Sequence, residues 1–303
     1  MLSVFVDAND SLAAVFERLH RNDDPRLRIH RDADVAPEAL PEVLSGAAIA
    51  IIDHTYLPTD VARRCAGLKH VVFLGTGARS YMNPEELAEL GIEVHIIKGY
   101  GDIAVAEAAI ALMWAAARNV ALMDRKMRAG QWLREDGMQL TGKTLGLIGY
   151  GGIGAEVARI ASGSGMRVLA WNRTPKSAPN VSFVGLDQLL SESHVVSLHL
   201  LLTDETRGFL SRERIARMRR DAVLVNTARG ALVDEAAMIE ALGSGQLRHA
   251  ALDVFEVEPL PADHPLAKLS NVTLSAHSAF RTPEASDNLV EAALAHCRRI
   301  AKG

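Results

Sequence analysis

Short runs of β-branched and other apolar residues recur along the chain, separated by stretches whose apolar residues have helical spacing. This alternation is typical of a parallel α/β sheet, because parallel strands are buried on both faces and need crossover helices between them. The pattern predicts two series of strands. The first comprises residues 3–6, 47–52, 70–74 and 93–97, and the second 144–148, 167–171, 195–200, 222–226, 250–254 and 272–275.

Two helical patterns connect the series and divide the chain. Residues 103–119 are rich in Ala, Leu, Met and Glu and predict a long buried hinge helix, although a helix covered by a second subunit has the same composition. Residues 283–300 predict a terminal helix that returns to the first lobe. We therefore predict two Rossmann-like doubly wound domains, with a nucleotide-binding domain over residues 99–278 inserted in a discontinuous substrate domain of residues 1–98 and 279–303.

Composition narrows the function. The 303 residues are 49% apolar, enough for two buried cores, and the net charge of −4 argues against a nucleic-acid partner. The one basic run, residues 212–220, contains Glu213 and follows a helical pattern, which indicates a solvated helix surface. Two distant cysteines, Cys65 and Cys297, suggest neither a disulfide framework nor a metal site. We expect a cytoplasmic protein without a secretory signal, a membrane span or a bound metal.

A glycine-rich segment follows the predicted strand at 144–148. Gly149, Gly151 and Gly154 have the G-x-G-x-x-G spacing, with Gly152 and Ile153 between them, and an Ala-rich helical pattern begins there. The glycines allow a tight turn, close approach of a pyrophosphate and close helix packing, and the helix N-terminus offers free N–H donors. An ordinary strand-to-helix turn can carry such a triplet, but the context favours a dinucleotide site.

The end of the next strand bears on the choice of dinucleotide. Asn172 stands where NAD enzymes usually carry an acid that binds the adenosine ribose. Arg173 adds a positive charge and Thr174 a hydroxyl, both suited to a 2′-phosphate, although an arginine here can also simply face solvent. The sequence favours NADP(H), with NAD(H) as the alternative.

Three polar side chains follow later strands. Arg229, Glu258 and His277 each come after a predicted strand, and ligands of open parallel sheets bind at the carboxyl ends of strands. Each residue alone has an ordinary structural explanation. Their joint occurrence indicates an active site.

The segments around these residues carry a family resemblance over nearly the whole chain. GYGGIG, VNTARGALVDE, ALDVFEVEP and SAHSA together resemble the D-isomer-specific 2-hydroxyacid dehydrogenase family. The resemblance implies an NAD(P)-dependent enzyme, a homodimer, that interconverts a small 2-oxo acid and its 2-hydroxy acid. The family's catalytic arginine falls on Arg229, its glutamate on Glu258 rather than Glu256, and its histidine on His277.

These implied roles agree with the chemistry of reducing a 2-oxo acid. His277 can protonate the carbonyl oxygen, and a neighbouring Glu258 carboxylate favours the imidazolium form. The planar guanidinium of Arg229 can hold the substrate carboxylate.

Other segments match the family less sharply. The segment FLGTGARS resembles the family's substrate-binding glycine loop, which implies Thr76 and Gly77 as substrate-binding candidates, although a strand-ending turn explains them equally well. Asp253 matches the residue that contacts the nicotinamide carboxamide. Further cofactor-lining candidates, each with an even structural alternative, are His199, Thr203, Thr227 and Ala228.

Departures from the family leave the substrate open. Ile52 and His54 stand where phosphoglycerate dehydrogenases carry arginines, which disfavours phosphoglycerate. Arg281 can bind a second carboxylate or pair with an acid at the domain edge. Glyoxylate, hydroxypyruvate and longer 2-oxo acids remain candidates. A non-catalytic dinucleotide-sensing corepressor is the alternative function, and a formate dehydrogenase relative is disfavoured by the acid at Glu258, which that reaction does not need.

Overall fold

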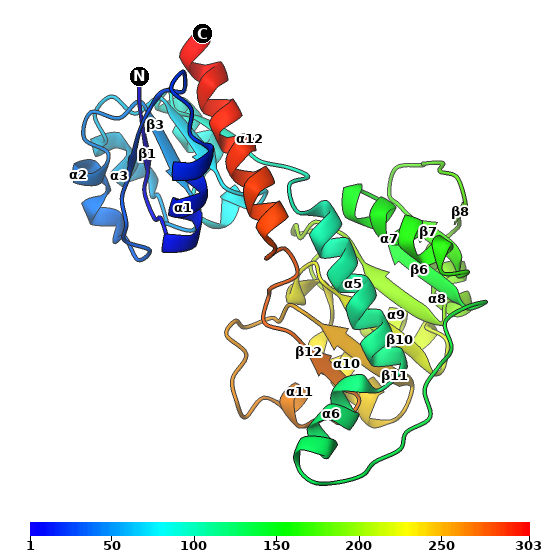
Figure 1. Cartoon of the computed structure of the whole chain (residues 1–303). Coiled ribbons are helices and arrows are strands. Elements are labelled where there is room, and N and C mark those ends of the chain that lie inside the picture. The colour runs from blue at the N-terminus through cyan, green and yellow to red at the C-terminus, as the bar shows by residue number, and fades with distance from the viewer. The chain divides into compact units, whose positions relative to one another are not determined.

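The computed structural model describes residues 1–303, which form two compact units (Figure 1). Unit 1 contains residues 1–101 and 281–303, and unit 2 contains residues 102–280. Each unit has one parallel sheet with helices on both faces. The predicted fold class, two doubly wound parallel α/β domains, is confirmed.

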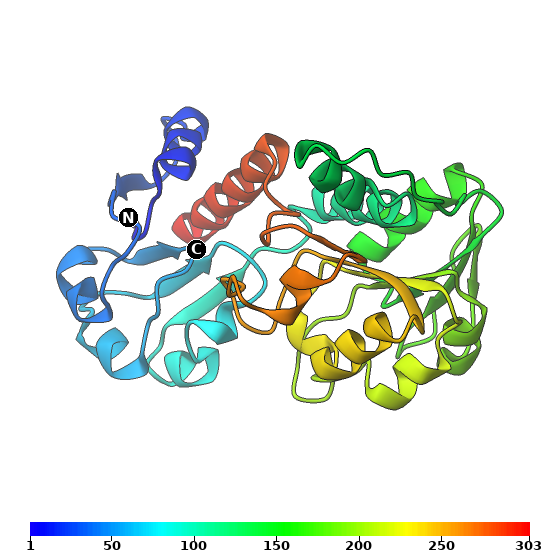
Figure 2. The ribbon, with the colours of Figure 1, turned by 90° about the horizontal axis from the view of Figure 1, so that it is seen from below.

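The sheet of unit 1 has the strand order β2-β1-β3-β4-β5. Helices α1 and α12 pack on one of its faces and share a core with Phe5, and helices α2, α3 and α4 cover the other (Figures 1 and 2). The strands are β1 (Leu2–Phe5), β2 (Arg26–Ile29), β3 (Ile49–Ile52), β4 (His70–Phe73) and β5 (Glu93–Ile96). The helices are α1 (Asp10–Leu19), α2 (Leu40–Val43), α3 (Thr59–Arg64), α4 (Pro84–Glu89) and α12 (Pro283–Lys302).

The sheet of unit 2 has the order β12-β11-β10-β9-β6-β7-β8. Helices α5 and α7 cover one face, and α8 to α11 cover the other. The strands are β6 (Thr144–Ile148), β7 (Arg167–Trp171), β8 (Val181–Phe183), β9 (Val195–Leu198), β10 (Ala222–Asn226), β11 (Leu247–Leu252) and β12 (Val272–Leu274). The helices are α5 (Asp102–Ala117), α6 (Val120–Arg128), α7 (Gly152–Gly163), α8 (Leu186–Glu192), α9 (Arg212–Arg217), α10 (Glu235–Gly243) and α11 (Pro265–Lys268).

All ten predicted strands are present, but two further strands, β2 and β8, were not predicted. Both lie at sheet edges, where a strand is not buried on both faces and loses its apolar signature. The predicted strand at 250–254 is wrong by several residues, because β11 runs from Leu247 to Leu252. The predicted hinge helix ends at Ala117 rather than 119, since Asn119 adopts a left-handed φ of 53° and directly precedes α6.

No single helix has the length and apolar composition needed to cross a membrane, although α5 and α6 together meet these criteria across a 66° bend.

Candidate active site

The glycine loop after β6 has the backbone geometry that the motif predicts. Gly149 has a φ of +95°, and a Cβ there would lie 2.5 Å from the carbonyl oxygen of His199. A Cβ on Gly154 would lie 2.7 Å from the carbonyl oxygen of Gly149, so α7 packs directly against the turn. Gly151 directly precedes α7, and a Cβ added to it would meet no atom within 4 Å. The loop therefore leaves room for a phosphate at the helix N-terminus.

Asn172 connects this loop to the turn after β7. Its Oδ1 accepts a hydrogen bond from the backbone N–H of Tyr150 at 3.1 Å, and its Nδ2 donates to the carbonyl oxygen of Thr174 at 2.8 Å. Arg173 forms an exposed ion pair with Glu205 at 2.9 Å. Such a surface pair contributes about 0–1 kcal/mol, so little is lost when the guanidinium turns to another anion.

The remaining cofactor candidates lie after β9 and β10. His199 bonds to Ser197 at 2.9 Å, and its removal from water lowers the pKa of its imidazole to about 4. Thr203 is exposed, and its backbone N–H donates to the Thr206 hydroxyl. Thr227 is buried, and its hydroxyl has no hydrogen-bond partner in the structure. An unpaired buried hydroxyl costs about 1–3 kcal/mol, which a ligand at this position would offset.

Asp102, which the sequence did not single out, faces the start of α7. A Cβ on Gly152 would overlap Oδ2 of Asp102. Burial, and then the charge of Glu156, raises the pKa of Asp102. The Asp102 carboxyl therefore lies beside the N-terminus of α7, where the glycine loop leaves room for a phosphate.

His277 and Glu258 form a direct pair. Nδ1 of His277 lies 2.7 Å from Oε2 of Glu258, and the other carboxylate oxygen accepts the backbone N–H of Phe255 at 2.9 Å. Both side chains are a little over one third exposed. The pair is fixed in place yet open to a ligand.

Asp253 holds the loop that carries His277. The buried carboxylate accepts hydrogen bonds from the Ser275 hydroxyl and from the backbone N–H groups of Ser278 and Ala279, and its carbonyl oxygen accepts the N–H of His277 at 2.7 Å. These bonds stabilise the left-handed backbone of His277, whose φ is 47°. Contact of Asp253 with the nicotinamide stays a prediction.

Arg229 stands on a loop that two unpredicted residues shape. The buried Asn226 side chain donates to the carbonyl oxygen of Arg229 at 2.9 Å and accepts the N–H of Ala228 at 3.0 Å. A Cβ on Gly230 would overlap the backbone of Phe255 and Glu256. The Arg229 loop therefore packs against the loop that leads to Glu258, and only a glycine allows this contact.

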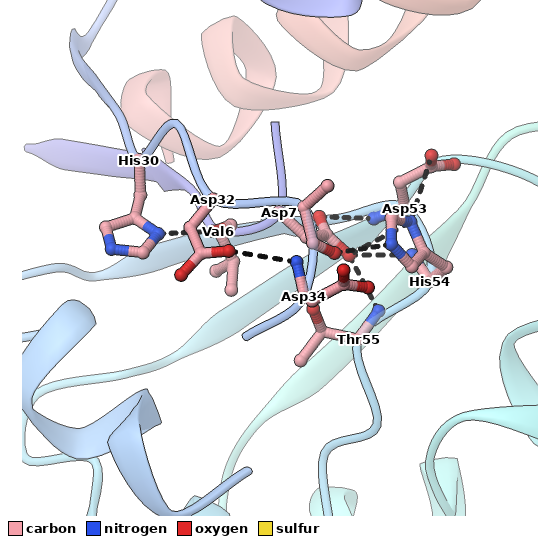
Figure 3. A network of polar contacts seen from close by, with 9 residues as sticks. Val6, Asp7, His30, Asp32, Asp34, Asp53, His54 and Thr55 are labelled. Atoms are coloured by element: carbon pink, nitrogen blue, oxygen red, sulfur yellow. Dashed lines mark hydrogen bonds and ion pairs between the residues drawn. The ribbon is translucent and has the colours of Figure 1, made fainter. Parts of the chain in front are cut away.

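Unit 1 has its own polar group at the carboxyl ends of β1 and β3 (Figure 3). Fully buried Asp7 accepts the backbone N–H groups of Asp53, His54 and Thr55 at 2.9, 2.7 and 2.6 Å. The His54 ring contacts Asp53 at 3.3 Å and the carbonyl oxygen of Ala33 at 2.6 Å. The bond to Asp53, aided by the Asp7 charge, raises the pKa of His54 to about 9.

The residues expected to bind substrate in unit 1 lie at the same edge of its sheet. Thr76 is exposed and Gly77 starts a short 3₁₀ turn, both just after β4. Ile52 is fully buried within β3 and offers a ligand no contact. Of these two residues, His54 therefore offers the cationic side chain.

Comparison with known proteins decides the family. Residues 110–279 match the model of the D-isomer-specific 2-hydroxyacid dehydrogenase NAD-binding domain, which is more than half of the chain. The chain belongs to this family. It is 38% identical to a hydroxypyruvate reductase of Thermotoga maritima over 84% of both chains. It is 42% identical to a glyoxylate reductase of Korarchaeum cryptofilum over 68% of this chain and 65% of the relative.

One similar protein of known structure was solved with a dinucleotide bound. An acyclic imino acid reductase, crystallised with NADPH and D-Arg, is 27% identical, covers 96% of this chain and 94% of its own, and has a TM-score of 0.83. The chain is therefore an NAD(P)-dependent oxidoreductase of the 2-hydroxyacid dehydrogenase family, and this prediction is confirmed. A corepressor-like sensor is not favoured. The open space at Gly151 and the unpaired Thr227 hydroxyl both suit a bound dinucleotide.

Proposed function

We propose that this chain reduces a small 2-oxo acid, glyoxylate or hydroxypyruvate, to the 2-hydroxy acid, with the D configuration where C2 of the product is chiral, and that it prefers NADPH. The observation that carries this proposal is the 2.7 Å pair of His277 and Glu258, because it supplies the proton that carbonyl reduction requires. The two curated relatives, a hydroxypyruvate reductase and a glyoxylate reductase, support the substrate class.

In this mechanism the bound nicotinamide supplies the hydride, and the protein positions the substrate and the proton. Glu258 accepts Nδ1–H of His277, so the proton at Nε2 is the one available to the carbonyl oxygen. Arg229 binds the substrate carboxylate through its planar donor fork. Asp253 and Asn226 position the two loops through their backbone bonds.

The preference for NADPH is supported by the strand end after β7. The residue that follows β7 at the expected ribose position is Asn172, which is not an acid. Both groups of its side-chain amide form hydrogen bonds within the protein. Arg173 is held only by an exposed pair with Glu205. A 2′-phosphate would take the guanidinium from Glu205, because a doubly charged phosphate outcompetes a solvated carboxylate.

We propose that the two units have the functions that the sequence predicts. Unit 2 binds the dinucleotide through Gly149 to Gly154, His199, Thr203, Thr227, Ala228 and Asp253. Thr76 and Gly77, both in unit 1, remain our proposed substrate-binding residues there. The unit boundaries fall at Gly101 and Arg281, where the sequence predicted 98 and 279.

The active form that we propose is a cytoplasmic homodimer. The two buried free thiols, Cys65 and Cys297, agree with a reducing compartment. The net charge of −4 agrees with a small-molecule substrate and with no nucleic-acid partner. Light scattering coupled to size exclusion would give twice the 32.7 kDa chain mass for the dimer, and the chain mass itself would refute it.

Oxidation of NADPH and of NADH, followed at 340 nm with glyoxylate, hydroxypyruvate and pyruvate, tests the function. We expect turnover with NADPH, and a loss of about 10²–10⁴-fold in kcat for His277→Gln. His20→Gln, which removes a histidine bonded to Pro25, is the matched control and should be fully active. Cofactor binding without reduction of any 2-oxo acid would overturn the proposal.

The cofactor preference is tested separately. Arg173→Gln should raise the KM for NADPH about tenfold and leave that for NADH unchanged. Arg220→Gln, at an exposed arginine after α9, is the control. Equal effects on both dinucleotides would refute the role of Arg173.

A further inference from the structure

A cluster of side chains of metal-binding types lies in unit 1, whereas Arg229, Glu258 and His277 belong to unit 2. His70 begins β4, and Glu93 and His95 belong to the neighbouring edge strand β5. In the parallel register His70 is paired with Glu93, and His95 follows two residues along β5, so all three lie on one face of the sheet. The sequence did not predict this cluster, because it requires the pairing of β4 with β5.

The three donor atoms have the spacing of a metal site. Nδ1 of His70 and Nε2 of His95 are 3.2 Å apart, and each lies 3.7 Å from Oε2 of Glu93. A point equidistant from three atoms so placed lies about 2 Å from each, which is the length of zinc–nitrogen and zinc–oxygen bonds. No rearrangement of the strands is needed for the three atoms to share one ion.

The chemistry of the donors favours a transition metal. Two imidazoles and one carboxylate suit zinc, whereas magnesium and calcium prefer oxygen ligands. Glu93 is 69% exposed, and this leaves a path for an ion from solvent.

A fourth ligand is within reach on α12. The ring of His296 lies 5.6 Å from that of His95, centre to centre. Arg299 donates to Nδ1 of His296 at 2.8 Å, which leaves Nε2 as the nitrogen free to turn toward the cluster. An ion would then connect β4, the edge strand β5 and the terminal helix.

We propose that His70, Glu93 and His95 bind one zinc ion, with His296 or water in the fourth position, and that this ion stabilises unit 1. His70 and Glu93 lie at the amino ends of their strands, whereas the Thr76 turn follows the carboxyl end of β4. The site is therefore structural and independent of the proposed reaction.

Titration of the chelator-stripped full chain with zinc chloride, followed by calorimetry and by elemental analysis after gel filtration, tests the proposal. We expect one zinc per chain, a rise in Tm on binding, and no binding of magnesium. His95→Gln and His70→Gln should each weaken binding at least tenfold, and each should remove the rise in Tm.

Two controls make the outcome decisive. His20→Gln removes a histidine outside the cluster and should bind zinc like the wild type. Cobalt substitution should give the visible absorption of a tetrahedral site in the wild type and lose it in His95→Gln. Unchanged zinc affinity in a folded His70→Gln or His95→Gln variant would overturn the proposal, as would an equal loss in His20→Gln. Because the readout is binding, failure of the proposed reductase activity would not affect this result.

Discussion

At Gly230 the loop that carries Arg229 packs against the loop that leads to Glu258. Gly230→Ala tests how much the candidate active site depends on that contact. An added Cβ would overlap the carbonyl carbon and oxygen of Phe255 and the nitrogen of Glu256. All three are backbone atoms. No change of rotamer can therefore relieve the overlap, and the two loops must move apart.

The size of that movement sets the expected effect. Non-bonded carbon atoms rest about 3.5–4.0 Å apart, so the loops must separate by more than about 1 Å. Overpacking of this kind costs about 1–3 kcal/mol of stability. Displacing a positioned group by about 1 Å costs about 10²-fold in rate. Since Arg229 lies on one loop and Glu258 on the other, we expect kcat/KM to fall about 100-fold while the dinucleotide still binds.

Initial rates of NADPH oxidation with glyoxylate or hydroxypyruvate, with Tm in parallel, measure both effects. Gly243→Ala, at the end of α10 where an added Cβ meets no atom within 4 Å, is the matched control. It should keep full activity and gain slightly in stability, because alanine is the better helix former. A Gly230→Ala enzyme with the wild-type kcat/KM would show that the loop contact does not position Arg229, and would refute the reasoning.

Three further predictions follow from single contacts. Asp102→Asn should tighten dinucleotide binding about fivefold near pH 7, measured by NADPH fluorescence, because the Asp102 carboxylate beside the α7 N-terminus repels a phosphate; weaker binding would contradict this. His54 has a pKa of about 9 in the folded chain and an ordinary value of 6.5 in the unfolded chain. The stability that protonated His54 gives the fold is therefore complete below pH 6.5 and is lost as pH rises through 9. Since its ring is 41% exposed, the loss should be at most about 1 kcal/mol, and a His54→Gln variant should show no such decline in Tm. Asn226→Ala should cost about 1–3 kcal/mol by leaving buried groups of the Arg229 loop unpaired, and an unchanged urea midpoint would refute it.

Buried strands could be predicted from the sequence because burial on both faces leaves a run of apolar residues. The strands β6, β7 and β10 have the predicted ends, and each lies inside the sheet of unit 2. The edge strand β2, Arg26–Ile29, alternates exposed and half-buried residues and has two arginines in four positions. Pairing with β1 makes this segment a strand, and no local pattern encodes that pairing.

Residues for the candidate site could be proposed from the sequence, but the contacts that hold them could not. Arg229, Glu258 and His277 are polar residues after strands, a pattern visible along the chain, and the structure places Glu258 against His277. Asn226 and Gly230 resemble ordinary turn residues. Their roles depend on contacts with segments that only the folded sheet brings near, such as the Phe255 backbone.

Groups other than Arg229, Glu258 and His277 hold much of the loops after β10, β11 and β12. Asn226 holds the Arg229 loop, Gly230 sets its distance from the Phe255 backbone, and Asp253 fastens the His277 loop with four hydrogen bonds. Because Asn226 and Asp253 are buried, their bonds are shielded from water, and the fold itself sets the backbone positions from which Arg229 and His277 project. In the reaction that we propose, the proton donor and the arginine that binds the carboxylate would be in position before the substrate binds, which is the condition under which such groups accelerate hydride transfer.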